Sequence, residues 1–259
     1  MRILISNDDG ILAPGLAALR AAVADLGEVT VVAPDSAQSA AGHGITLKRP
    51  LVVQRVRLGG AVPFEGLSVD GQPADCVRLA VHKLLDRAPE LVLSGINAGS
   101  NVGINVLYSG TVAAAAEGAM CGIPAVAFSA RIGDQADFPR IARLCRWVLN
   151  ELLDAGLRPG ELINVNIPEL GPGRPRGVRV RRQSTAELEE DYRLHHDADG
   201  REAYLLAEGF RFGPSRKDTD IEALAQGYIT VTPLHVDMTN HRRLEDLAQR
   251  PWNRPPAPG

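Results

Sequence analysis

Two adjacent carboxylates near the amino end of the chain could hold a divalent cation. Asp8 and Asp9 follow the apolar run 2–6, which predicts a buried β-strand, and Gly10 closes the turn. Like charges this close repel, so one carboxyl would be driven to bind a proton unless a cation lies between them. Ligands bind at the carboxyl ends of strands in open α/β sheets. The pair therefore favours a metal site, with a solvated Asn-Asp-Asp-Gly turn as the alternative.

Two later loops add polar groups that also follow predicted strands. Ser39 and His43 lie in the loop after the strand 28–33, and Asn97 lies in a glycine-rich stretch after the strand 90–94. Asn97 occupies the nucleophile position of a Gly-x-Ser-x-Gly elbow, but an amide cannot act as that nucleophile. Its carbonyl oxygen can bind a metal, or its amino group can donate a hydrogen bond to a phosphate.

A fourth polar stretch precedes a predicted helix of small residues at 112–120. Ser109, Gly110 and Thr111 offer hydroxyls and free backbone N–H groups at the start of this helix. A helix start of this kind binds anions. The stretch lacks the Gly-Lys-Ser/Thr of a Walker P-loop, and an ordinary N-cap is the alternative.

The elements that carry these loops predict an α/β fold. A strand, a helix at 14–26 and a strand at 28–33 form a βαβ unit, so the two strands should be parallel. Two strands around Gly59-Gly60 should form a hairpin. Further helices are predicted at 74–85 and 138–153, and a strand at 162–168, whose Asn164 and Asn166 are expected to be sheet-edge hydrogen bonders. We expect a Rossmann-like, mostly parallel sheet flanked by helices.

The character of the sequence changes after residue 170. A turn-rich link is followed by a polar region at 183–213, which predicts a protruding β-hairpin arm. A final strand at 227–233 and short helices follow. We therefore predict a Rossmann-like catalytic core at 1–170 and a C-terminal part at 171–259 that joins subunits.

Composition limits the class of protein. The chain has 259 residues, a formal net charge of −3 and 45% hydrophobic residues, which is typical of a globular protein. With 28 basic against 31 acidic residues, nothing favours duplex nucleic acid as a partner. The 3 cysteines lie far apart, which argues against a cysteine zinc motif or a disulfide scaffold. Without a leader or a long apolar run, we expect a cytoplasmic protein that does not contact a membrane.

Together, the four polar stretches should meet at one rim of the sheet. Two carboxylates, one hydroxyl and one amide are oxygen ligands that suit Mg²⁺ or Mn²⁺ and not zinc. A cation beside an anion-binding helix start suits a phosphate ester. The cation would polarise the phosphoryl oxygens and lower the pKa of a bound water, which would then attack the phosphorus.

The sequence resembles the SurE family, the survival protein E group of 5'/3'-nucleotidases, over nearly its whole length. The matching residues are Ile-Ser-Asn-Asp-Asp-Gly at 5–10, Pro-Asp-x-x-x-Ser at 34–39 with Gly-His at 42–43, Ser-Gly-Ile-Asn-Ala-Gly-Ser-Asn-Val-Gly at 94–103, Tyr-Ser-Gly-Thr-Val-x-Ala-Ala-x-Glu-Gly at 108–118, Asn-Val-Asn-Ile-Pro at 164–168, Thr-Asp at 219–220 and Gly-Tyr-Ile-Thr-Val-Thr-Pro-Leu at 227–234.

This resemblance implies divalent-metal-dependent hydrolysis of nucleoside 5'- and 3'-monophosphates, and of short-chain polyphosphate in some members. It also implies a homodimer or homotetramer with one Mg²⁺ or Mn²⁺ per subunit. The family's metal ligands fall on Asp8, Asp9, Ser39 and Asn97, and its phosphate-side residues fall on Asn101 and the 109–111 turn.

Two catalytic assignments go beyond the ligands. Asp8 or Asp9 is predicted to orient or deprotonate the attacking water, because Asp35 is the only other carboxylate in these loops. His43 is the candidate for a general acid or a phosphate contact.

Three other functions remain as alternatives. A haloacid-dehalogenase-like phosphatase would use Asp8 as a covalent nucleophile, but it needs Asp-x-Asp and a later Lys in a matching loop. A phospho-receiver regulator needs a third Asp and a Lys after a late strand, and it is shorter. A nucleotide-sensing protein without turnover is the third alternative, which a phosphate-release assay would separate from an enzyme.

Overall fold

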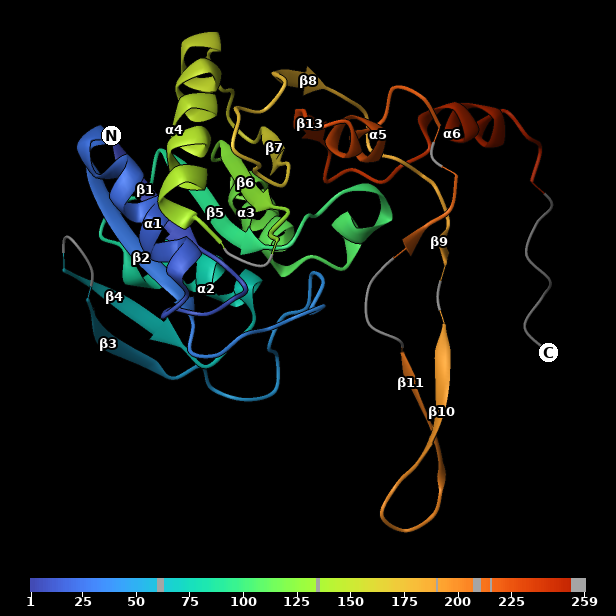
Figure 1. The fold of residues 1–259 in the computed structure, drawn as a ribbon, viewed down its shortest axis with the longest axis horizontal. Coiled ribbons are helices and arrows are strands. Elements are labelled where there is room, and N and C mark those ends of the chain that lie inside the picture. The colour runs from blue at the N-terminus through green and yellow to red at the C-terminus, as the bar shows by residue number, and fades with distance from the viewer. Residues whose placement is uncertain (60–62, 134–135, 190, 207–210, 215, 253–259) are drawn as a thin grey trace.

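The computed structural model describes residues 1–59, 63–133, 136–189, 191–206, 211–214 and 216–252. A nine-stranded sheet runs through the centre of the molecule (Figure 1). Its strands are β1 (Arg2–Ser6), β2 (Glu28–Pro34), β3 (Val53–Leu58), β4 (Phe64–Val69), β5 (Leu91–Ala98), β6 (Ala125–Ala130), β7 (Leu162–Ile167), β8 (Val178–Val180) and β13 (Ile229–Leu234). Their order across the sheet is β3-β4-β2-β1-β5-β6-β7-β13-β8.

The middle of the sheet is parallel, from β4 to β7. From β1 the chain first builds outward through β2, and it later returns to the other side of β1 as β5. This reversal of direction makes the boundary between β1 and β5 a topological switch point, where open α/β sheets bind ligands beyond the carboxyl ends of the strands. Asp8 and Asp9 directly follow β1.

Helices cover both faces of the sheet. Side chains that alternate along each strand pack on α1 (Pro14–Val23) and α4 (Phe138–Ala155) on one face. They pack on α2 (Pro73–Leu79) and α3 (Gly110–Met120) on the other face. The small residues of α3 allow close packing, since a Cβ at Gly118 would lie 2.7 Å from Val92 Cγ2. These layers confirm the predicted α/β fold.

Several predicted elements differ at their ends. The strand predicted at 90–94 continues as β5 to Ala98, with a register shift against β6 between Ser94 and Asn97. The predicted helix at 14–26 ends in a tighter 3₁₀ turn (Ala24–Leu26), and the one at 74–85 ends in a wider turn (Ala80–Leu84). The β3–β4 hairpin is confirmed as antiparallel, although residues 60–62 of its turn lie outside the described residues.

Some of the C-terminal residues add strands to the sheet, and others form a hairpin outside it. β13 pairs antiparallel with β7, and β8 pairs parallel with β13. The predicted β-hairpin is present and projects from the body (Figure 1). The remaining elements are η3 (Gly103–Leu107), β9 (Leu188–Glu189), β10 (Tyr192–His196), β11 (Glu202–Leu206), β12 (Arg211–Phe212), α5 (Asp220–Ala225) and α6 (His241–Ala248).

The division into 1–170 and 171–259 stays a prediction, with the central sheet running across it. In the part of the chain that the structure describes, every helix is too short or too polar to cross a bilayer.

Candidate functional site

A cavity of roughly 270 Å³ opens at the carboxyl ends of β1 and β5. Because both strands end at the switch point, loops that are far apart in the sequence meet here. The residues that line the cavity are Asp8, Asp9, Ser39, Ala40, Asn97, Ala98, Gly99, Ser100, Asn101, Asn105, Tyr108 and Ser109. All four predicted metal ligands and two of the predicted phosphate-side residues are among them.

Asp8 lies between the end of β1 and the start of α3. Its carboxylate is buried, and its Oδ1 accepts a hydrogen bond from the hydroxyl of Thr111. Burial raises the pKa of Asp8 above its ordinary value, and the neighbouring Asp9 adds to this, while the hydroxyl and backbone N–H of Thr111 act against it. The start of α3, predicted to bind an anion, therefore faces the Asp8 carboxylate as well as the cavity.

Gly110 makes this approach of α3 to β1 possible. A Cβ at this position would lie 2.7 Å from Asp8 Cβ and 2.9 Å from Pro73 Cγ. Real side chains do not approach so closely, so only glycine lets the helix start lie against the carboxylate. Gly110 and Thr111, the two predicted phosphate-side residues that do not line the cavity, therefore lie beside the Asp8 carboxylate.

Asp9 connects the turn after β1 to the end of β5, the strand that carries Asn97. Burial raises the pKa of Asp9, and the Ala98 N–H, which donates to its Oδ2 at 3.2 Å, opposes that rise. Asn97 Nδ2 donates to the Gly99 carbonyl at 2.8 Å, which turns its Oδ1 away from that bond. The register shift between Ser94 and Asn97 changes the direction of the end of β5, which carries Asn97.

The loop that carries Ser39 is held by backbone hydrogen bonds on both sides of this residue. The Gln38 N–H donates to the Asp8 carbonyl at 2.8 Å, and the Gly42 N–H donates to the Tyr108 carbonyl at 3.0 Å. Ser39 is thereby brought to the cavity from the end of β2.

His43 lies beside a second cavity of roughly 580 Å³ and not among the residues that line the first. Its Nε2 lies 2.8 Å from Oε1 of Glu117. Ser109 lines both cavities, so they are neighbours along α3. The structure therefore brings together the predicted ligands and Asn101, and it sets His43 to one side of them.

Asn101 is fixed by a buried polar network that the sequence interpretation missed. Its N–H donates to Asn166 Oδ1 at 2.8 Å, and its carbonyl accepts from Nδ2 of Asn164 and Asn166 at 2.8 and 3.1 Å. Its own Nδ2 donates to Ser129 Oγ at 2.8 Å. All three supporting side chains are fully buried.

The prediction that Asn164 and Asn166 lie at a sheet edge was wrong. β7 is an interior strand between β6 and β13, and the two amides point from it toward the site loop. The available signal was their spacing: two asparagines at i and i+2 share one face of an otherwise apolar strand. Buried side-chain amides need hydrogen-bond partners, so such a pair indicates that a neighbouring loop supplies them.

The donor set is compatible with a hard cation. Around the cavity it mixes two carboxylates with hydroxyl and amide oxygens, which Mg²⁺ and Mn²⁺ accept. Within the described ranges, no three His, Cys, Asp or Glu side chains gather in a way that could hold a metal. Any ion held here would depend on the hydroxyl and amide groups as well as on the acids.

Known proteins resemble this chain over most of its length. The sequence profile of the family described as "Survival protein SurE" matches residues 3–190. "5'-nucleotidase SurE 1" of Thermus thermophilus is 47% identical over 249 residues, covering 96% of this chain and 97% of the relative. "5'-nucleotidase SurE" of Syntrophobacter fumaroxidans is 42% identical over 253 residues, covering 98% and 100%.

A solved structure is also similar. The crystal structure of the SurE protein from Aquifex aeolicus superposes with a TM-score of 0.80 at 39% identity, covering 95% of this chain and 98% of that one. Profile, relatives and fold agree with the motifs in the sequence, and the chain belongs to the SurE family.

Proposed function

We propose that this chain is a divalent-metal-dependent 5'-nucleotidase that hydrolyses nucleoside monophosphates to nucleoside and phosphate. The main observation in support is that one cavity, at the switch point of the sheet, is lined by Asp8, Asp9, Ser39 and Asn97. The names of the relatives, 5'-nucleotidase SurE, support the reaction class. Nucleoside 3'-monophosphates and short-chain polyphosphate are proposed as further substrates because the water would attack a phosphoryl group in each of them.

The residues around the cavity fit one Mg²⁺ or Mn²⁺ per subunit. Asp8 and Asp9 supply carboxylates whose pKa values burial has raised, so a cation would stabilise their charged forms. Asn97 offers Oδ1, since its Nδ2 is bound to Gly99. Asn105, which lines the same cavity, has a buried Oδ1 without a partner among the described residues. Such an oxygen gains from a cation or a water beside it.

Once bound, the ion would polarise the phosphoryl oxygens and lower the pKa of a coordinated water. Asp8 or Asp9 would orient the attacking water or accept its proton. Asn101 and the Ser109-Gly110-Thr111 turn would hold the phosphate oxygens, with the network behind Asn101 limiting its movement. His43 remains a candidate for the general acid or for a further phosphate contact.

The second cavity gives room for the nucleoside. It shares Ser109 with the first cavity, and apolar side chains such as Val112, Leu107 and Met238 form much of its lining. A base and ribose attached to a phosphate at Ser109 could extend along the outer face of α3. Apolar walls with a few polar groups are typical of small-molecule sites.

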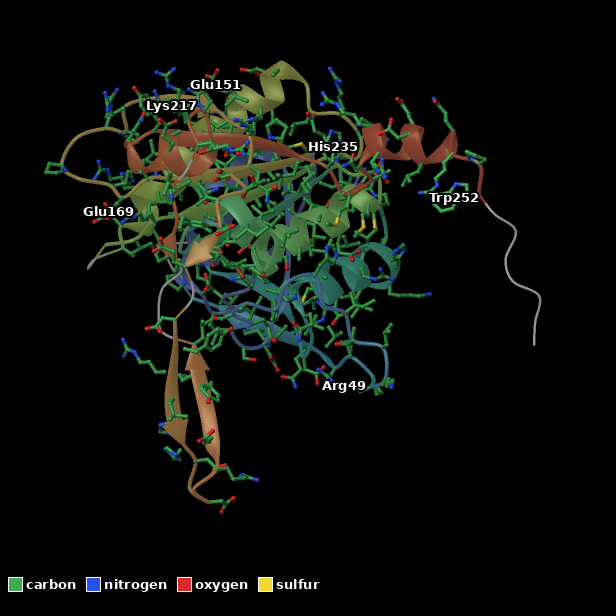
Figure 2. The ribbon with its side chains drawn as sticks, turned by 90° about the vertical axis from the view of Figure 1, so that its right-hand side faces the viewer. Arg49, Glu151, Glu169, Lys217, His235 and Trp252 are labelled. Atoms are coloured by element: carbon green, nitrogen blue, oxygen red, sulfur yellow. The ribbon has the colours of Figure 1, made fainter. Side chains whose placement is uncertain are left out.

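The C-terminal part is proposed to join subunits into a homodimer or homotetramer. Two-stranded hairpins are marginal in water, yet β10 and β11 project from the body (Figure 2) with exposed apolar side chains. Trp252 lies beyond the end of α6 on the side away from the sheet (Figure 2) and is exposed. Clustered exposed apolar side chains, such as those of this hairpin, mark interaction surfaces.

The test replaces Asp9 by Asn. Phosphate release from a nucleoside 5'-monophosphate with Mn²⁺ or Mg²⁺ should fall by at least about 100-fold, because a ligand and candidate base is lost. The unfolding temperature should not fall, since Asp9 accepts one hydrogen bond that Asn can also accept. Asp35→Asn is the matched control, because Asp35 is exposed and bonds to Ser36 outside the cavity. Full activity of Asp9→Asn, or a trapped phosphoryl-Asp8, would refute the mechanism.

A further inference from the structure

Glu117 is the one charged side chain of α3, whose other residues are small or apolar. Its side chain is 4% exposed, so its carboxylate needs compensation for lost hydration. Two groups supply it: His43 Nε2 lies 2.8 Å from Oε1, and an Arg78 guanidinium nitrogen lies 3.7 Å from Oε2. A helix that packs by small residues therefore retains one buried acid, which is directed at a loop residue.

The loop that Glu117 meets is the one that carries Ser39. Ser39 lies between two backbone bonds of this loop, from Gln38 to Asp8 and from Gly42 to Tyr108. His43 follows directly, and its ring reaches across to Glu117, 74 residues further along the chain. The side-chain contact thus continues the row of contacts that hold the loop against the end of β1 and against α3.

The backbone of this loop is strained next to Ser39. Ala40 has φ +54°, in the left-handed region that disfavours residues with a Cβ. Such a conformation costs on the order of 1–3 kcal/mol and persists only where surrounding contacts enforce it. The backbone hydrogen bonds of Gln38 and Gly42, on either side of Ala40, hold the loop in this conformation. The His43–Glu117 contact limits how far Gly42, the residue before His43, can move.

We infer that Glu117 is a positioning residue, which acts through His43 to keep Ser39 at the cation site. The inference rests on the proposed function, because it concerns a ligand of the proposed ion. Arg78 has a different part: it balances the charge of Glu117 from α2, and within the described residues this ion pair does not involve the loop at 38–43. Loss of His43 or of Glu117 should therefore loosen the loop, whereas loss of Arg78 should not.

The experiment measures Mn²⁺ binding to the substrate-free full chain by titration calorimetry, with a thermal unfolding curve for each variant. His43→Ala and Glu117→Met are compared singly and together, with Arg78→Met as the matched control. Met keeps the length and the helix preference of Glu, and the partly exposed His43 and Arg78 can take up water instead. A general-acid role of His43 would not change this readout, because no substrate is present.

His43→Ala and Glu117→Met are each expected to bind Mn²⁺ about tenfold more weakly than the wild type, as for other residues that support metal ligands from behind. The double variant should bind no more weakly than either single one, since both remove the same contact. His43→Gln, which keeps a donor for Glu117, should bind more tightly than His43→Ala, and Arg78→Met should match the wild type.

Two results would overturn the inference. One is Mn²⁺ affinity at the wild-type level in folded His43→Ala, a loop variant that does not depend on the packing of α3. The other is additive weakening in the double variant, which would mean that the two residues act independently. A wild-type chain that binds no Mn²⁺ would instead refute the proposed function, and the inference with it.

Discussion

The hydroxyl of Thr111, at the start of α3, donates a hydrogen bond to the buried carboxylate of Asp8, at the end of β1. This contact joins residues 103 positions apart and links the first turn of the chain to the predicted phosphate-binding turn. The proposed cation-binding carboxylate and the proposed phosphate-binding turn thus lie side by side. A metal-bound phosphate ester would need both.

Gly110→Ala should disturb this junction. The new methyl group would lie under 3 Å from Asp8 Cβ and Pro73 Cγ, so α3 or the Asp8 turn must shift. We expect a loss of about 1–3 kcal/mol in the free energy of unfolding, as for other overpacked positions. Activity should also fall. Urea unfolding and phosphate release measure the two effects.

Gly171→Ala is the matched control for this change, because a Cβ there meets nothing within 4 Å. Its free energy of unfolding should stay within about 0.5 kcal/mol of the wild type. If Gly110→Ala were as stable and as active as this control, the close approach of α3 to Asp8 would be unnecessary.

Asn166→Leu should cost both stability and phosphate binding. The substitution leaves the buried N–H of Asn101 without its acceptor, which costs about 1–3 kcal/mol. Because Asn101 is then less well held, KM for the nucleotide should rise. Thr230→Val is the control on the neighbouring strand: Thr230 pairs with Asn166 in register, but its buried hydroxyl has no partner among the described residues. Removing that hydroxyl should be neutral or stabilising, so equal losses in the two variants would argue against the Asn101 network.

Asp220 should make stability depend on pH. It is fully buried, and burial raises its pKa, although the N–H groups of Gly103, Ser184 and Ile221 act against that rise. Between the ordinary pKa and the raised one, the folded chain binds more protons than the unfolded chain. Asp220 therefore makes the free energy of unfolding fall as pH rises through this window, by at most about 1.4 kcal/mol per pH unit.

The test for Asp220 compares slopes. Urea unfolding of the wild type and of Asp220→Asn is measured from pH 4 upward, and the variant should lack this contribution to the slope. Asn can still accept the Ser184 and Ile221 bonds, which share one oxygen of Asp220. Parallel curves for the two proteins would show that Asp220 does not titrate differently in the folded and unfolded states.

The hairpin arm should control the assembly. Cross-strand pairing puts Tyr192 opposite Leu206 and Leu194 opposite Tyr204, so these four side chains form an apolar patch on one face of the arm. Leu194→Asp on that face should shift the mass measured by light scattering toward a single chain, because it would bury a charge in the interface. His195→Asp, whose side chain points to the opposite face, is the control. A mass unchanged by Leu194→Asp would place the interface elsewhere.

Much of the site follows from local sequence and from the rules of parallel sheets. The strand at 2–6 and its acids, the loop with Ser39 and the stretch with Asn97 each come after a strand, and such strand ends meet at one rim. The pairing of strands that are far apart in the sequence could not be predicted from local sequence. The partners of Asn164 and Asn166 depend on β7 lying inside the sheet, and that position is created by β13, more than 60 residues later.

His43 is the other instructive residue. Its place between two glycines indicated a functional loop, but its nearest acid is Glu117 and not Asp8 or Asp9. No local pattern encodes that choice, because it depends on how the loop lies against α3. The continuation of β5 to Ala98 was missed for a related reason: glycine and asparagine indicate a loop, yet pairing with β6 keeps the segment extended.

The most direct measurement of the central claim is the anomalous signal of a crystal soaked in Mn²⁺. We predict one ion per subunit in the cavity at the end of β1, about 2.0–2.3 Å from oxygens of Asp8, Asp9 and Asn97, with Ser39 on the same side. If the cavity holds no ion at saturating Mn²⁺, and Asp8 and Asn97 point away from each other, then the metal-dependent phosphatase mechanism proposed for this chain is wrong.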